Sequence, residues 1–373
     1  MATCGSIGAL AATPPVFRGY QPKTTKELLA WHAGGDPEAA VNPNLPIVDP
    51  HHHLFNTLSD PVYYRMEDLA DDMKGGHRVL GTVYVEGYNA GWRADGPANY
   101  RSLGEAERIV RLTQKPLAML WGASRVAAGI VSNVNLAAGD DVAPVLAAHK
   151  AASEGRLRGI RHLAAYDNGT VGNFYKHQPP QRLLADAEFR RGMARLQEAE
   201  LSFDAWAYHT QLAEVADLAA AFPGVEIIVN HVGGLIGMAE HGMQREAAFK
   251  LWQQGLAQLA RHPNVRVKVG GMGMTVFGFG FEDGVKPAHS DQLAHAWSPL
   301  VDVCLDNFGT RRCMFESNFP VDKQSTGYNA VWNAFKKLSA SLSKDEQRDL
   351  FYRTACTAYR LPELLREGDA IPI

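Results

Sequence analysis

Residues 47–55 read Ile47-Val48-Asp49-Pro50-His51-His52-His53-Leu54-Phe55, a short apolar run that gives way to polar residues. This pattern is typical of a buried strand whose far end opens into a polar site. On a strand, His51 and His53 point to the same side, with backbones roughly 6.6 Å apart, while His52 points the other way. Because an imidazole nitrogen binds a metal at about 2.0 Å, the pair suits one small cation. The alternative is that the histidines only make hydrogen bonds.

Outward from this stretch, apolar β-branched runs alternate with helix-like segments. Seven further runs are expected to be strands, at 79–88, 128–137, 157–166, 201–209, 225–234, 265–274 and 312–320. The helix-like segments cover 105–112, 186–199, 211–221, 246–261, 289–307, 329–342 and 344–359, and the last two would seal the outside. Eight strands alternating with helices predict parallel strands with right-handed crossovers, and eight closes a (β/α)8 TIM barrel. In the rival fold, an open doubly wound sheet, a glycine-rich turn would usually stand where this chain has histidines.

The first 44 residues differ from the rest. We expect residues 1–44 to form an N-terminal arm and residues 45–373 to form the barrel as a single domain. Only residues 24–32 of the arm have helical character, with Thr25 as the N-cap, and five prolines punctuate it, at Pro14, Pro15, Pro22, Pro37 and Pro43. Such an arm would wrap the body or a partner subunit, which leaves a homo-oligomer open.

Composition restricts the partners. The chain has 373 residues, 46% hydrophobic and 21% charged, which predicts a globular protein with a large core. A formal net charge of -3 without Lys or Arg runs gives no basis for binding nucleic acid or an anionic membrane. No stretch approaches 18 apolar residues, so no membrane span is expected. The four cysteines lack metal or disulfide spacing and the N-terminus lacks the positive start of a secretory signal, so we expect a cytoplasmic protein.

In a TIM barrel the site lies at the C-terminal ends of the strands. The polar residues at these ends are therefore the candidates: Asp49, His51, His53, Glu86, Asn133, Asn135, Arg161, His162, Asp204, Trp206, Tyr208, His209, Asn230, His231, Glu316, Asn318 and, just beyond, Asp322. Several histidines converging with carboxylates at one rim are difficult to explain by packing alone. The expected partner is a small-molecule substrate.

Four segments together resemble the amidohydrolase superfamily: Asp-x-His-x-His at 49–53, IIVNHVGG of strand six, HPNVRVKVGG of strand seven and RCMFESNFPVD of strand eight. The likeness covers roughly residues 45 to 360 and is greatest to the branch that holds sugar-lactone hydrolases, dicarboxylate lactonases and some aromatic-acid decarboxylases. It implies that His51 and His53 bind a divalent metal and that His231 contacts the metal or the substrate. Zinc is the metal expected first, with a metal-free site as the alternative.

The resemblance also implies substrate-binding positions. His209, which ends strand five, matches a family ligand, and the alternative is an N-cap or loop hydrogen bond. Arg161 resembles a substrate-anchoring cation, since its planar fork matches a carboxylate or lactone oxygens, but it could instead pair with a structural carboxylate. Further substrate-binding candidates are His162, Tyr208 and Trp206.

Strand eight departs from the family pattern. The family carries Gly-Ser-Asp before an aromatic-Pro pair, and that Asp accepts the proton when water is activated. This chain has Glu316-Ser317-Asn318 instead. An amide takes up no proton at neutral pH, so Asn318 can orient water or substrate but cannot be the general base.

Three carboxylates could replace the lost charge. Residues 316 and 318 share a strand face, so Glu316 could lie one layer lower, as support for the histidines or as a ligand. The alternative is that Glu316 is buried and paired with Lys268 or Arg266. Asp322 is another candidate acceptor, unless it caps the following turn. Glu86 could accept a proton or raise histidine basicity, unless it is solvated at a strand end.

These observations favour a metal-dependent hydrolase that opens a lactone or related cyclic ester bearing carboxylate or hydroxyl groups. The cation would polarise the carbonyl and lower the pKa of bound water. His231 or a tyrosine would stabilise the oxyanion, Arg161 would hold the substrate, and the proton would pass to one of Glu316, Asp322, Glu86 or His209. Decarboxylation of an aromatic acid on the same metal is the second expectation, and a non-catalytic binding barrel is the third.

Overall fold

The computed structural model describes residues 16–55, 62–87, 90–114, 124–174 and 178–372. In these residues, eight parallel strands form one sheet in chain order: β1 (Ile47–His52), β2 (Val79–Val85), β3 (Arg125–Asn133), β4 (Leu157–Arg161), β5 (Ser202–Ala205), β6 (Ile227–Val229), β7 (Val265–Gly270) and β8 (Cys313–Glu316). The last strand returns to the first, because the His53 amide donates to the Phe319 carbonyl at 2.7 Å and the Asn318 amide to the His51 carbonyl at 3.0 Å. The predicted (β/α)8 barrel is confirmed.

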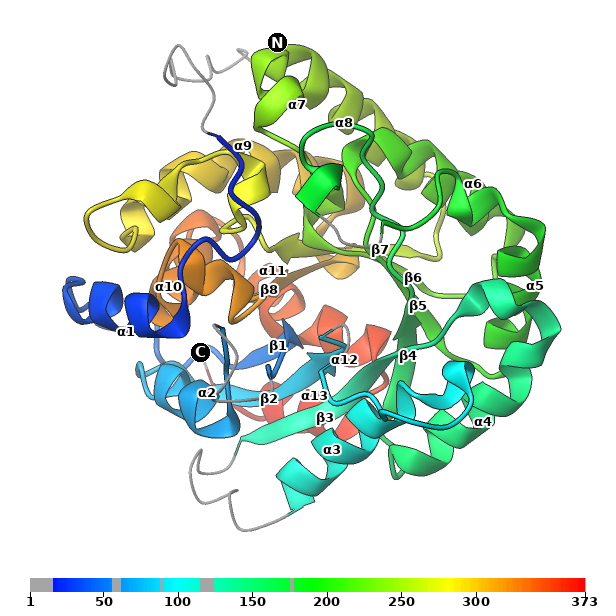
Figure 1. The fold of residues 1–373 in the computed structure, drawn as a ribbon. Coiled ribbons are helices and arrows are strands. Elements are labelled where there is room, and N and C mark those ends of the chain that lie inside the picture. Colours follow the sequence, from blue (N-terminus) through cyan, green and yellow to red (C-terminus); the bar gives the residue numbers. More distant parts are fainter. Residues whose placement is uncertain (1–15, 56–61, 88–89, 115–123, 175–177, 373) are drawn as a thin grey trace.

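Helices surround this sheet (Figure 1). They are α1 (Thr25–Ala33), α2 (Met66–Met73), α3 (Leu103–Gln114), α4 (Val142–Ala152), α5 (Ala187–Glu198), α6 (Leu212–Ala221), α7 (Ala239–Met243), α8 (Arg245–Leu259), α9 (Ser290–Phe308), α10 (Tyr328–Leu338), α11 (Lys344–Arg348), α12 (Thr354–Ala358) and α13 (Pro362–Asp369). In α5, Phe189, Met193 and Leu196 recur at helical spacing and are fully buried. The Asp186 side chain accepts from the Phe189 amide at 2.9 Å and fixes where this helix begins.

Of the two C-terminal segments predicted to seal the outside, α10 does pack against the outer helix α9, with the Phe335 and Trp297 rings 5.5 Å apart, but the helices after residue 344 differ from the prediction. Tyr352, Cys356 and Leu364 pack against Val83 and Met314 of the strands as a second apolar cluster. A Cβ at Gly81, near the start of β2, would lie 2.7 Å from the Leu364 side chain. These helices therefore cover the end of the barrel where the strands begin. The end where the strands terminate is left for the site.

Element boundaries show the limits of sequence patterns. The expected strands are present but shorter, and β3 begins three residues before its predicted start. Residue 88, the expected end of strand two, and residues 1–15 of the expected arm lie outside the described residues. The N-cap of α1 is Thr24 rather than Thr25, because the Thr24 and Glu27 side chains each bond to the other's backbone amide. The sequence reading also missed α2, α4 and α13.

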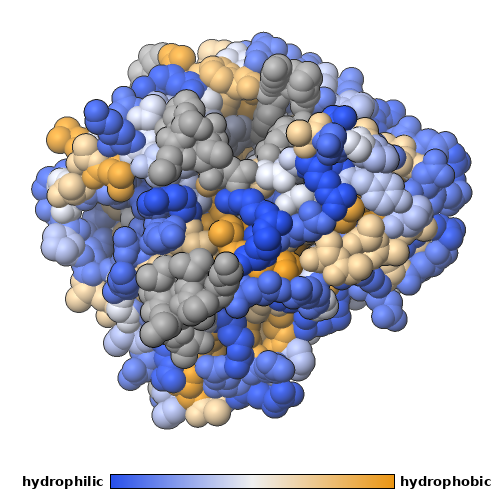
Figure 2. Space-filling view, turned by 60° about the horizontal axis from the view of Figure 1, so that its bottom comes forward, coloured by the Kyte–Doolittle hydropathy of each residue, from blue (hydrophilic) through white to orange (hydrophobic). Residues whose placement is uncertain are grey.

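The surface carries scattered apolar residues. Figure 2 shows a face covered mainly by hydrophilic residues, with apolar residues in smaller areas between them. The large apolar side chains that are exposed come from separate segments: Val16, Leu29, Phe174, Met243, Leu251 and Val285. None of the described helices combines the length and the apolar character that crossing a bilayer requires.

Four histidines with lowered pKa values predict acid sensitivity. Burial lowers the pKa of His52, His149, His162 and His209 to about 4. The unfolded chain takes up these protons below its own pKa of about 6.5, so stability is lost as the pH falls below that value. Each histidine costs about 2 kcal/mol at about pH 5, and four together approach a typical total stability.

We therefore expect the free energy of unfolding, measured by urea denaturation, to fall steeply between about pH 6.5 and 5. The His149→Gln variant should show a shallower slope, because one proton fewer is taken up on unfolding. A stability that stays constant over this range would contradict the burial of these rings as neutral groups.

Candidate active site

Three imidazole rings converge where β1 and β6 end. His51 lies in β1, His53 follows it, and His231 follows β6. The Nε2 atoms of His51 and His53 are 3.2 Å apart, and the rings of His51 and His231 have centroids 4.6 Å apart. All three residues are buried. The two rings of the His-x-His pair therefore point to the same side, and His52 points away to Thr82 at 2.8 Å.

Glu316 lies behind two of these rings. Its Oε1 accepts from His231 Nδ1 at 2.8 Å and from the His231 amide at 3.2 Å, and its Oε2 lies 2.8 Å from His51 Nδ1. His53 Nδ1 faces the Val85 carbonyl at 2.9 Å. For His53 and His231, the acceptor beside Nδ1 favours the proton on that nitrogen, which leaves Nε2 with its lone pair. Of the two alternatives for Glu316, the structure shows contact with the histidines.

The predicted alternative partners of Glu316 pair elsewhere. Lys268 Nζ lies 2.8 Å from Asp204 Oδ2, and Arg266 pairs with Glu226. Lys268 Nζ also reaches His51 Nδ1 at 3.2 Å, so that nitrogen lies between an ammonium and a carboxylate. This contact of Lys268 was missed by the sequence reading. The available signal was Lys268 itself, a charged residue in a strand whose other residues, apart from Arg266, are apolar or glycine.

Two glycines, at the last position of β7 and directly after it, make room for this cluster. A Cβ at Gly271, whose φ is +65°, would lie 2.2 Å from His231 Nδ1, and one at Gly270 would lie 2.3 Å from the Glu316 carbonyl oxygen. The backbone of strand seven can therefore approach His231 and Glu316 only without side chains.

The donor set fits one divalent metal. Two imidazole nitrogens on a single tetrahedral ion lie about 3.3 Å apart, close to the 3.2 Å between His51 and His53. Burial lowers the pKa of both rings well below 6.5 and also lowers the pKa of His231, which favours the neutral form that metal ligands require. Ligand atoms of His51, His231 and Glu316 lie within 4.8 Å of one another, which is a second possible set of three that does not include His53 and in which Glu316 would itself be a ligand.

Arg161 faces the histidines from β4. Its Nε donates to Glu86 Oε1 and its Nη2 to the Glu86 carbonyl, both at 2.6 Å, while Nη1 lies 3.4 Å from His51 Nε2. Glu86 is therefore a buried partner of Arg161 and not a solvated strand-end residue. Glu86 holds the guanidinium so that one nitrogen points at the imidazole cluster.

Breaking this pair should destabilise the fold. We expect Arg161→Gln to lower the free energy of unfolding by about 3 kcal/mol, because a buried carboxylate loses its cation. The double variant Arg161→Gln/Glu86→Gln should recover at least half of that loss. Urea denaturation of the four proteins measures the coupling, and strictly additive losses would contradict it.

Asn318 and Asp322 form a unit after β8. The strand ends at Glu316, and Asn318 has a left-handed backbone with φ +54°, so the prediction that residues 316 and 318 share a strand face is wrong. Asn318 Nδ2 donates to Asp322 Oδ1 at 2.7 Å, and the Gly273 amide donates to Asp322 Oδ2 at 2.8 Å. Burial raises the pKa of Asp322 well above its usual value. Asn318 Oδ1 is buried without a partner among the described residues, which suits a water or substrate donor.

The unit explains why an amide stands at 318. We expect Asn318→Asp to be less stable, because two carboxylates 2.7 Å apart would share one proton. The folded pair would then bind more protons than the unfolded chain, so the loss grows as the pH rises above about 4. Thermal unfolding at several pH values measures it, and a loss that does not depend on pH would contradict this explanation.

Besides Arg161, the predicted substrate-binding residue Trp206 packs directly on the cluster. Its ring packs edge-on against His231 with centroids 4.7 Å apart, and Tyr208 packs on Trp206 at 5.5 Å. His162 is on the opposite side of β4 from Arg161: its Nδ1 accepts from the Leu136 amide at 3.2 Å and its ring packs on Phe189. The prediction that His162 binds substrate is not supported by this placement, because the ring faces the outer helices.

His209 also lies away from the three rings. Its Nδ1 accepts from the Ile236 amide at 3.4 Å and its ring packs against His241, centroids 5.2 Å apart. His241 in turn contacts Asp167 at 2.9 Å. The structure thus shows for His209 the loop hydrogen bond that was its alternative.

This arrangement defines a class: a TIM barrel with a histidine-rich metal-binding set at the C-terminal ends of its strands. Residues 48–361 match the family described as Amidohydrolase, so the chain belongs to the amidohydrolase family. The predicted resemblance is confirmed.

Two curated proteins are similar to this chain in sequence. The chain is 33% identical over 205 residues to the uncharacterized protein y4mH of Sinorhizobium fredii, a match that covers 55% of this chain and 61% of that protein. It is 30% identical over 223 residues to an L-fucono-1,5-lactonase of Burkholderia multivorans, covering 59% of this chain and 69% of the lactonase. The matched part thus spans less than two thirds of y4mH.

A solved amidohydrolase of Burkholderia multivorans has a similar fold. The form with bound HEPES has a TM-score of 0.63 at 24% identity, and the form with bound zinc has a TM-score of 0.61 at 23% identity. In both, 85% of this chain matches 99% of that chain. Together, family, relatives and fold indicate an enzyme of the amidohydrolase superfamily.

Proposed function

We propose that the protein hydrolyses a lactone or related cyclic ester of a small substrate bearing hydroxyl or carboxylate groups. The observation that carries this proposal is the convergence of three imidazoles with one nitrogen of Arg161. The similarity to an L-fucono-1,5-lactonase supports the choice of substrate class.

His51, His53 and His231 would hold one divalent metal, with zinc as the first choice. When bound, the metal would polarise the lactone carbonyl and lower the pKa of water. Glu316 orients two of the three rings, and Val85 orients the third through its carbonyl. Arg161 donates to the substrate carbonyl or carboxylate oxygen from a fixed position.

Asp322 is the carboxylate that we assign as proton acceptor. Glu86 is held by Arg161, and Glu316 by two histidines, so neither is available without loss of the site's geometry. Asp322 is bound by neutral donors, and its raised pKa makes it a stronger base than an ordinary aspartate. Water adds to the carbonyl carbon, the ring C–O bond breaks, and the ring oxygen leaves as a hydroxyl. Each turnover gives one carboxylic acid.

Elemental analysis followed by a lactone screen tests the proposal. We expect about one divalent metal per chain and acid release from aldonolactones, detected with a pH indicator and abolished by a chelator. Carbon dioxide released from aromatic acids, without ring opening, would favour the decarboxylase instead. Retained lactone binding without turnover would favour a binding barrel, and either result overturns the hydrolase.

A further inference from the structure

The N-terminal arm crosses the end of the barrel that carries the histidines. In Figure 1 its dark blue segment runs past α9 and α10 towards α1. The Gly19 carbonyl accepts from Thr275 Oγ1 at 2.9 Å. The Lys23 backbone both donates to and accepts from the Gln324 side chain, at 3.0 and 2.9 Å. Thr275 follows β7 and Gln324 follows β8, so residues 16–24 lie over the C-terminal ends of these strands.

Aromatic contacts connect this segment to the metal-binding set. The Tyr20 and Tyr208 hydroxyls are in contact. Tyr208 packs on Trp206, and the Trp206 ring packs on His231. Phe17, only 2% exposed, packs against both Tyr20 and Phe174. A continuous row of aromatic rings therefore runs from the arm to His231.

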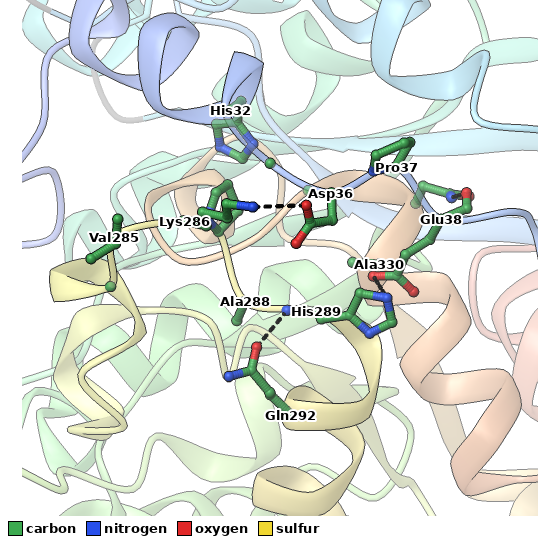
Figure 3. Close-up of a pocket in the computed structure, with 15 residues that line it drawn as sticks. His32, Asp36, Pro37, Glu38, Val285, Lys286, Ala288, His289, Gln292 and Ala330 are labelled. Carbon is green, nitrogen blue, oxygen red and sulfur yellow. Dashed lines mark hydrogen bonds and ion pairs between the residues drawn. The ribbon is translucent and has the colours of Figure 1, made fainter.

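The arm is also anchored on both sides of Tyr20. Arg18 pairs with Asp283, and Lys23 Nζ donates to the Glu282 carbonyl. Farther along, a cavity of about 710 Å³ separates the arm from the loop before α9 (Figure 3). At its edges Lys286 pairs with Asp36 at 2.8 Å, and Glu38 accepts from the Ser290 amide at 2.9 Å. The contacts of Arg18 and Lys23 fix the segment around Tyr20, and those of Asp36 and Glu38 fix the later part of the arm.

The family match begins at residue 48, so residues 16–24 lie outside what the family accounts for. We propose that they form a fixed outer wall of the active-site mouth that restricts the site to small substrates, with Tyr20 as the specificity-determining residue. Tyr20 acts by position: it holds Tyr208 and Trp206 against His231 and occupies space above them. The substrate-size part of this inference rests on the proposed lactonase function.

The first test needs no activity. In metal-depleted protein, diethyl pyrocarbonate modifies the histidines that it can reach. Peptide mass spectrometry then measures the rate of modification at His53 and at His231. We expect Tyr20→Ala to raise these two rates at least threefold and to leave His149 unchanged. The matched control is Trp31→Phe, which removes an arm hydrogen bond to the Gly284 carbonyl at 2.9 Å away from the aromatic row. Equal rates of labelling at His53 and His231 in Tyr20→Ala and in the natural chain would overturn the proposal that the arm forms a wall of the site.

The second test measures selectivity. We expect Tyr20→Ala to raise kcat/KM for bicyclic dihydrocoumarin relative to monocyclic δ-valerolactone by about tenfold, mainly through KM. Tyr20→Phe, which keeps the ring but loses the hydroxyl that contacts Tyr208, should raise the ratio by less. Trp31→Phe should keep the natural ratio. An unchanged ratio in Tyr20→Ala overturns the assignment of Tyr20. If the natural chain opens neither lactone, the proposed function fails while the labelling test still decides whether the arm covers the site.

Discussion

The Glu316→Gln variant is expected to bind divalent metal about 10- to 100-fold more weakly than the natural chain. Glutamine offers one acceptor oxygen where Glu316 faces two Nδ1 atoms, those of His51 and His231. Its amide nitrogen would then face one imidazole as a donor and move that ring's proton to Nε2. A protonated Nε2 cannot bind a metal. Competition with a fluorescent zinc chelator measures the affinity, and turnover should fall with it.

The matched control is Glu226→Gln. This carboxylate pairs with Arg266 and precedes β6, away from the histidines that follow that strand. It should leave metal affinity within about twofold of the natural value. Unchanged metal content and unchanged turnover in Glu316→Gln would remove Glu316 from the account.

Replacing Asp322 with asparagine should lower kcat by about 10²- to 10⁴-fold while metal binding stays unchanged. The carboxylate must be ionised to accept a proton, and its raised pKa places that ionisation above the usual aspartate range. We therefore expect the rate of the natural enzyme to rise with pH through this ionisation, and the rise to disappear in the variant.

The control for this change is Asp369→Asn, which alters an aspartate bonded to the Tyr352 hydroxyl at 2.7 Å near the C-terminus of the chain. Its pH profile should match that of the natural enzyme. If Asp322→Asn keeps both its rate and its pH dependence, another group accepts the proton.

Strand periodicity predicted much of this site. His51 and His53 follow a period of two and do meet, and Glu316, at the end of a strand, does point inward. The same rule could have separated Arg161 from His162, because consecutive strand residues face opposite sides. The structure places one at the cluster and the other against α5.

Periodicity fails where strands end. Asn318 adopts a left-handed backbone, so its side chain turns to Asp322, which comes back four residues later through a turn. His209 lies beyond the end of β5, where side chains no longer alternate between the two faces of the sheet. The position of Tyr20 depends on contacts with residues more than 180 positions away, such as Tyr208. The pattern of neighbouring residues in the sequence contains no information on such long-range contacts.

The most direct test of the central claim is anomalous X-ray diffraction from zinc-loaded crystals. The account predicts one zinc ion per chain, bound at about 2.0 to 2.1 Å by Nε2 of His51, His53 and His231, with Glu316 on the Nδ1 side. An ion bound elsewhere, or His53 and His231 turned away from a shared ion, would contradict it.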